Sequence, residues 1–175
     1  MILSSQIEQA VLRLTVLGEN IMSSTLVLIE CKKWIIESWL PKKYGMSFKK
    51  QKLTMQGRGI FEFEAVSTDK QIICKISAET AVAGRRIMAS GKKTKLRADC
   101  LMLALASAEK KLLILTETSM HDLALREQTA GRLPLDIKIT LVRLPADLKQ
   151  KLAAALDEES LGVRKSGNSD SFGAV

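Results

Sequence analysis

A predicted β-hairpin is the feature that most constrains how this chain folds. Residues Gly59 to Ser77 read GIFEFEAVSTDKQIICKIS, two alternating runs on either side of the polar pair Asp69 and Lys70. Alternation with a period of two is typical of half-buried strands, and a two-residue turn at Asp69 and Lys70 would pair Glu64 with Lys75. The apolar face would then hold Phe61, Phe63, Ala65, Cys74 and Ile76, and the opposite face Glu62, Glu64 and Lys75.

Length and composition favour one globular domain. The chain has 175 residues, of which 46% are hydrophobic, enough for a single sizeable core. We expect an α/β domain over residues 1–156 and a disordered polar tail over residues 157–175.

The three cysteines form no CxxC motif and His121 is the only histidine, which argues against a disulfide framework and against paired-histidine metal sites. No stretch offers 18 charge-free apolar residues, so we expect a cytoplasmic protein without a membrane partner.

The remaining pattern alternates helices and strands. Apolar residues at helical spacing predict a long helical segment over residues 4–40, ended by Pro41. After the hairpin we expect a basic loop over residues 78–95, a helix over 94–108, and an apolar strand beginning at Leu112. A helix capped by Ser119, a strand over 137–144 and a helix after Pro145 complete the order. A hairpin followed by such alternation predicts a central mixed sheet flanked by helices.

The element order, with an acid on one hairpin strand and a lysine on the next, resembles the PD-(D/E)XK restriction-endonuclease-like nucleases. The resemblance covers roughly residues 15 to 145 and implies Mg²⁺-dependent phosphodiester hydrolysis. It assigns Glu64 as the first acid and Lys75 as the lysine, with Glu19 or Glu30 as an acid from the first helix. We therefore expect Mg²⁺ to be held by Glu64, Glu62 and Glu19, and catalysis to involve Glu64, Lys75 and Glu62.

The motif also departs from the family pattern. Ile73 stands where the family has an acid two residues before the lysine, and the first acid is Glu64 without a preceding proline. Glu62 lies one strand repeat from Glu64 and is a candidate for the missing carboxylate. Asp99 and Arg97 on the crossing helix are further candidates to join the site, although a solvated helix face explains them equally well.

Two functions fit these residues. With a net charge of +8, the chain favours partners that carry phosphate, and the bases Arg85, Arg86, Lys92, Lys93 and Lys95 are the candidates to contact nucleic acid. The alternative is a non-catalytic interaction protein that associates, for instance as a homo-oligomer, through its N-terminal helices. In that case Glu64 and Lys75 form an ordinary cross-strand ion pair.

Overall fold

The computed structural model describes residues 25–55, 59–83, 86–87 and 89–166. The chain divides into two compact units, one of residues Met1–Ile29 with Pro145–Val175 and one of residues Glu30–Leu144. We expected a single domain over residues 1–156. The sheet and every candidate site residue that the structure describes belong to the larger unit, Glu30–Leu144.

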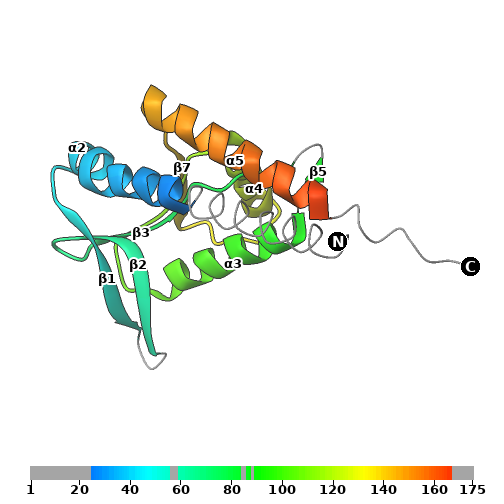
Figure 1. Ribbon diagram of the computed structural model, residues 1–175. Coiled ribbons are helices and arrows are strands. Elements are labelled where there is room, and N and C mark those ends of the chain that lie inside the picture. Colours follow the sequence, from blue (N-terminus) through cyan, green and yellow to red (C-terminus); the bar gives the residue numbers. More distant parts are fainter. Residues whose placement is uncertain (1–24, 56–58, 84–85, 88, 167–175) are drawn as a thin grey trace, which may run out of the picture. The chain divides into compact units, whose positions relative to one another are not determined.

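A five-stranded mixed sheet lies at the centre of the larger unit (Figure 1). Its strands lie side by side in the order β1 (Phe48–Met55), β2 (Gly59–Ser67), β3 (Ile72–Ser77), β6 (Lys110–Leu115) and β7 (Ile137–Leu141). The pairs β1–β2 and β2–β3 are antiparallel, whereas β3–β6 and β6–β7 are parallel. The predicted α/β class with a mixed sheet and flanking helices is confirmed.

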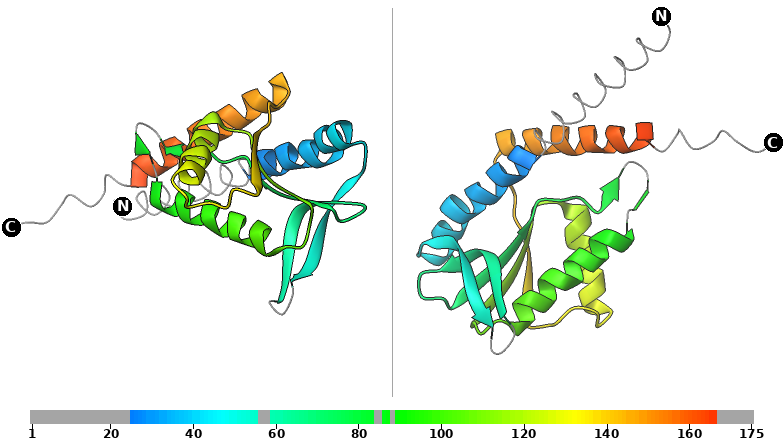
Figure 2. Two further views of the ribbon diagram at one scale, coloured as in Figure 1. Left: turned by 180° about the vertical axis from the view of Figure 1, so that it is seen from behind. Right: turned by 60° about the horizontal axis from the view of Figure 1, so that its bottom comes forward.

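Helices cover both faces of this sheet (Figure 2). On one face, α3 (Ala89–Leu105) and α4 (Thr118–Thr129) contribute buried side chains to a core with Phe63 and Ile73. On the other face, the π-helical turn η1 (Ile35–Trp39) and α2 (Leu40–Tyr44) contribute to a second core. Because strand side chains alternate between faces, the central strands β3 and β6 supply residues to both cores.

The first described helical segment continues past Pro41, where we expected it to end. Residues 25–34 are helical, and η1 and α2 follow without a break. Proline has no N–H to give to the helix, but at the start of α2 this group is not required. The π-helical turn, closed by the bond from Leu40 N–H to Ile35 O, precedes it. Gly45, with φ of 70°, ends the helix instead. The expected helix over residues 4–24 lies outside the described residues.

The predicted register of the hairpin is confirmed, but its turn and one of its faces differ. Ala65 pairs with Cys74 and Val66 with Ile73, as the predicted count requires. The connection spans residues 68–71 instead of two residues. The predicted apolar face was wrong for Phe61 and Phe63. Both side chains pack in the core beneath α3 and α4, because an irregularity in the β1–β2 ladder precedes them, while Ala65, Cys74 and Ile76 join the opposite core.

Three other elements differ from the sequence pattern. The expected basic loop over residues 78–95 contains β4 (Val82–Ala83), β5 (Arg86–Ile87) and the first turns of α3. Ser119 lies inside α4 and does not cap it; its hydroxyl accepts a hydrogen bond from Ala81 N–H. The last helix, α5 (Ala146–Ser166), follows Pro145 as predicted but runs beyond residue 156.

A buried carboxylate ties α3 and α4 together. The side chain of Glu127 on α4 is only 3% exposed and accepts hydrogen bonds from Arg97 on α3 and from Arg132 in the following loop. These bonds to Arg132 and Arg97 outweigh burial and lower the pKa of Glu127 from 4.5 to about 2. In the folded protein Glu127 is therefore an ionised carboxylate that accepts hydrogen bonds from two guanidinium groups.

Glu127 should make the free energy of unfolding depend on pH in the acid range. A carboxyl with a lowered folded pKa stabilises the fold above its unfolded pKa, so its contribution should be complete above about pH 4.5 and disappear towards pH 2. Urea unfolding should therefore show that the free energy of unfolding of the wild type exceeds that of Glu127→Gln by an amount that decreases as the pH falls. Glu109→Gln, at an exposed position, is the matched control. A difference for Glu127→Gln that is constant with pH would contradict this assignment.

Candidate functional site

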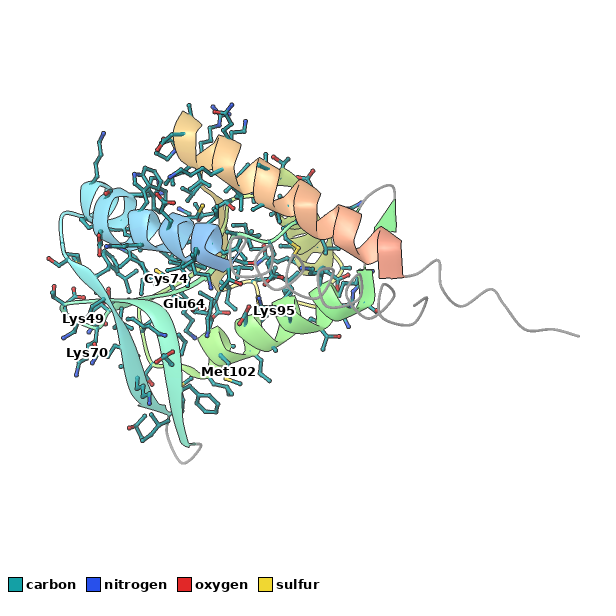
Figure 3. All side chains as sticks on the ribbon, in the orientation of Figure 1. Lys49, Glu64, Lys70, Cys74, Lys95 and Met102 are labelled. Atoms are coloured by element: carbon teal, nitrogen blue, oxygen red, sulfur yellow. The ribbon has the colours of Figure 1, made fainter. Side chains whose placement is uncertain are left out.

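The site begins where the β1–β2 ribbon separates from β3. β2 pairs with β1 from Ser67 to Gly59, but its ladder with β3 contains only the pairs at Ala65 and Val66. Glu64 is the next residue of β2 beyond this short ladder. It lies between the first helical segment and α3, as Figure 3 shows. Its side chain is 24% exposed, and its Oε2 atom is buried without a hydrogen-bond partner.

Lys75 on β3 brings the charges of this site together. Its Nζ lies 3.4 Å from Glu64 Oε2 and 4.0 Å from Asp99 Oδ1, and it donates a hydrogen bond of 3.0 Å to the carbonyl oxygen of Glu62. The ammonium also lies 5.5 Å from the centre of the Phe63 ring. The side chain of Lys75 is only 14% exposed and contacts groups from two elements, β2 and α3.

Asp99 on α3 supplies the second carboxylate of the cluster. Burial raises the pKa of Asp99, the Lys75 ammonium lowers it, and the negative charge of Glu64 raises it again, with a net upward shift. Asp99 therefore joins the site, as we considered from the sequence. Arg97, the other candidate from this helix, binds Glu127 instead.

The structure separates the other predicted acids from this cluster. The carboxylate of Glu62 lies 2.7 Å from Lys50 Nζ, and the hydrogen bond from Lys50 lowers the pKa of Glu62. Glu19 lies outside the described residues. Glu30 is exposed, and the residue of its helix that reaches the site is Lys32, whose Nζ lies 3.7 Å from Glu64 Oε1. No pattern in the sequence selects Lys32, because its helix and β2 are distant along the chain.

The predicted nucleic-acid-binding bases lie on and before α3. Lys92 and Lys95 lie on the first turns of α3 and form ion pairs with Glu79, which follows β3. Burial acts against the charge of Glu79, but hydrogen bonds from both lysines lower its pKa overall. Lys93 has no ionic partner among the described residues. The position of Arg85 and the side chain of Arg86 lie outside what the structure describes.

Two rows of charge therefore run side by side. Positions 75, 77 and 79 share one face at and beyond the end of β3, and Lys92, Lys95 and Asp99 share one face of α3 because they are three and four residues apart. The rows meet with opposite charges at both ends, Lys75 with Asp99 and Glu79 with Lys92 and Lys95. This complementary spacing is the signal by which the sequence could have placed α3 against β3.

The carboxylate oxygens of the site could supply some, but not all, of the ligands of a divalent cation. Carboxylate oxygens are the ligands that Mg²⁺ prefers, and the Oε2 atom of Glu64 is a buried acceptor without a hydrogen-bond donor. Within the described part of the chain, no group of three or more acidic, histidine or cysteine side chains is arranged to hold a metal ion. Glu64 and Asp99 would thus supply two ligands, and water or a phosphate would have to supply the others.

No family model, no curated protein and no solved structure matches the chain. Among the described helices, none has both the length and the apolar composition needed to cross a membrane.

The burial of Ile73 explains why an apolar residue stands two positions before Lys75. Ile73 is fully buried in the core beneath α3 and α4. We expect Ile73→Asp to lower the free energy of unfolding by roughly 3–5 kcal/mol, because it removes apolar packing and buries a carboxyl group without a partner. Ile73→Val should cost only about 1 kcal/mol. Urea unfolding measures both, and an Ile73→Asp variant as stable as Ile73→Val would show that this position opens to solvent.

Proposed function

We propose that this protein binds nucleic acid and hydrolyses phosphodiester bonds with a divalent cation held by Glu64 and Asp99 beside Lys75. The observation that carries the proposal is the convergence of an acid from β2, a lysine from β3 and an acid from α3, in which the buried Oε2 atom of Glu64 makes no hydrogen bond. Such a group of hard oxygen ligands beside a fixed ammonium suits phosphate chemistry.

The arrangement of elements supports the same proposal. A helix, three antiparallel strands with the acid and lysine on the second and third, the short β4–β5 pair, a crossing helix and a parallel strand follow one another along the chain. The resemblance to the PD-(D/E)XK nucleases rests on the hairpin with its acid and lysine, the crossing helix and the apolar strand. In this proposal Asp99 takes the role that the sequence assigned to Glu62, since the carboxylate of Glu62 is engaged by Lys50.

Each side chain has a distinct part in the proposed chemistry. Glu64 and Asp99 would hold the cation, which when bound would neutralise charge developing on the phosphate and acidify a water molecule. Lys75 would orient the attacking water or a phosphate oxygen through its remaining N–H donors. Its bond to Glu62 O and its contact with Phe63 fix the ammonium for this task before substrate arrives.

A non-catalytic interaction protein is the second candidate. The buried Ile73 and the lack of a three-ligand group among the described residues both favour it. In this case Glu64, Lys75 and Asp99 would form a structural ion-pair cluster. Leu26 and Ile29 on the first described helical segment, both more than half exposed, are side chains that association with a partner would bury.

Removal of single charges should separate the two candidates. With Mg²⁺ or Mn²⁺ and labelled DNA and RNA oligonucleotides, we expect cleavage by the wild type. Glu64→Gln, Asp99→Asn and Lys75→Met should each lower the single-turnover rate on the order of 100-fold or more. Glu62→Gln is the matched control and should retain activity near that of the wild type, because its carboxylate points to Lys50.

The pattern of rates decides between the assignments. Full activity in Glu64→Gln or Lys75→Met would show that cleavage does not depend on this site. Loss of activity in Glu62→Gln with retention in Asp99→Asn would return the second ligand to Glu62. A wild type that cuts neither DNA nor RNA with either cation would favour the non-catalytic candidate.

Nucleic-acid binding should depend steeply on salt, with Lys93 as one contributor. Each phosphate contact on duplex DNA adds about 0.9 to the magnitude of the slope of log K against log salt. Lys93 has no ionic partner among the described residues and is therefore free to contact a phosphate. We expect Lys93→Ala to remove about one such contact and so to reduce the magnitude of the slope by about 0.9. Lys138→Ala, on the edge strand β7, is the exposed control. Fluorescence anisotropy at several salt concentrations measures the slope, and an affinity that is flat with salt contradicts the phosphate contacts.

A further inference from the structure

The two ammonium groups that face Glu64 are held very differently. Lys75 approaches Oε2 and is anchored by Glu62 O, Asp99 and the Phe63 ring. Lys32 approaches Oε1 at 3.7 Å, and its side chain is 32% exposed. Its charge also acts on Asp99, whose pKa it lowers, but no other salt bridge or hydrogen bond holds the Lys32 ammonium among the described residues. The contact is also too long to be a hydrogen bond. Lys32 is therefore the ammonium that can leave Glu64 at the lower cost.

A divalent cation and Lys32 would compete for the same carboxylate. An ion bound to Glu64 and Asp99 would add two positive charges close to the Lys32 ammonium, and like charges at such distances repel strongly. Lys75 cannot move away without losing its other partners, whereas Lys32 has a flexible stem and access to solvent. The repulsion is relieved when Lys32 swings out.

We infer that Lys32 is a resident counter-ion that occupies Glu64 until a divalent cation displaces it, and that it thereby sets the cation concentration the site requires. The inference rests on the proposed function, because it concerns the regulation of the same site. It assigns a role to a residue that the family resemblance does not include. In the absence of the cation, Lys32 keeps the partly buried Glu64 carboxylate compensated.

Cation binding to variants at position 32 tests this inference without an activity assay. Isothermal titration with Mn²⁺ should give Lys32→Met a dissociation constant about tenfold or more below that of the wild type, because the competing charge is gone. Lys33→Met is the matched control, since Lys33 is the exposed neighbour on the same helix, and it should bind as the wild type does. Circular dichroism and thermal unfolding establish that each variant is folded.

A second measurement follows Lys32 itself. Acetylation of lysines with a limiting amount of reagent, read by mass spectrometry, should show Lys32 becoming more reactive when Mn²⁺ is added to the wild type, while Lys33 stays constant. Glu64→Gln should abolish this Mn²⁺ effect, because the cation and the ion pair both need the carboxylate.

The outcomes separate the inference from the function on which it rests. Tighter binding by Lys32→Met than by the wild type supports the inference, including the case in which only the variant binds measurably. Equal binding by both, with loss in Glu64→Gln, overturns the role of Lys32 and leaves the cation site intact. No binding by the wild type or by Lys32→Met overturns the cation site itself, and the inference with it.

Discussion

The need to compensate a charge in a buried strand organises this structure. β3 is buried on both faces except at Lys75, whose side chain is 14% exposed. An isolated buried ammonium would cost several kcal/mol, so opposite charges must reach it from neighbouring elements. Glu64 comes from β2, Asp99 from α3, and the carbonyl of Glu62 adds a hydrogen bond. The same contacts that make Lys75 tolerable in the sheet produce the only cluster for which we propose chemistry.

The departure of β2 from β3 makes room for that cluster. If the β2–β3 ladder continued beyond Ala65, Glu64 and Lys75 would be a cross-strand pair on a closed sheet, worth about 1 kcal/mol or less. Because the β1–β2 ribbon leaves the sheet there, the carboxylate meets charges from two helices as well. Its Oε2 atom is buried and makes no hydrogen bond, although the Lys75 ammonium lies 3.4 Å away. This hydrogen-bonding capacity left unused on a buried oxygen is the observation that favours a ligand over a purely structural role.

Much of the fold was accessible from sequence patterns, whereas the site was accessible only in part. The alternation in the hairpin predicted its register, and periodicity predicted the mixed α/β arrangement, because both depend on short-range geometry. The predicted helix end at Pro41 was wrong, because a π-helical turn lets the helix continue through the proline. The predicted helix cap at Ser119 was wrong, because its hydroxyl accepts a tertiary hydrogen bond from Ala81 N–H. The β-strand irregularity that moves Phe63 to the other face could not be predicted, because apolar and polar residues alternate regularly in the sequence at that point.

The sequence by itself determined that Glu64 and Lys75 would be neighbours, because a hairpin register follows from its turn and its alternation. Only the tertiary structure decided which other charges join them. Asp99 and Lys32 are brought to Glu64 by packing of α3 and of the first helical segment on opposite faces of the sheet, and Glu62 is turned away by Lys50. Such contacts depend on where apolar faces bury, so the complementary spacing of charges on β3 and α3 indicates a pairing only once the two elements are known to pack together.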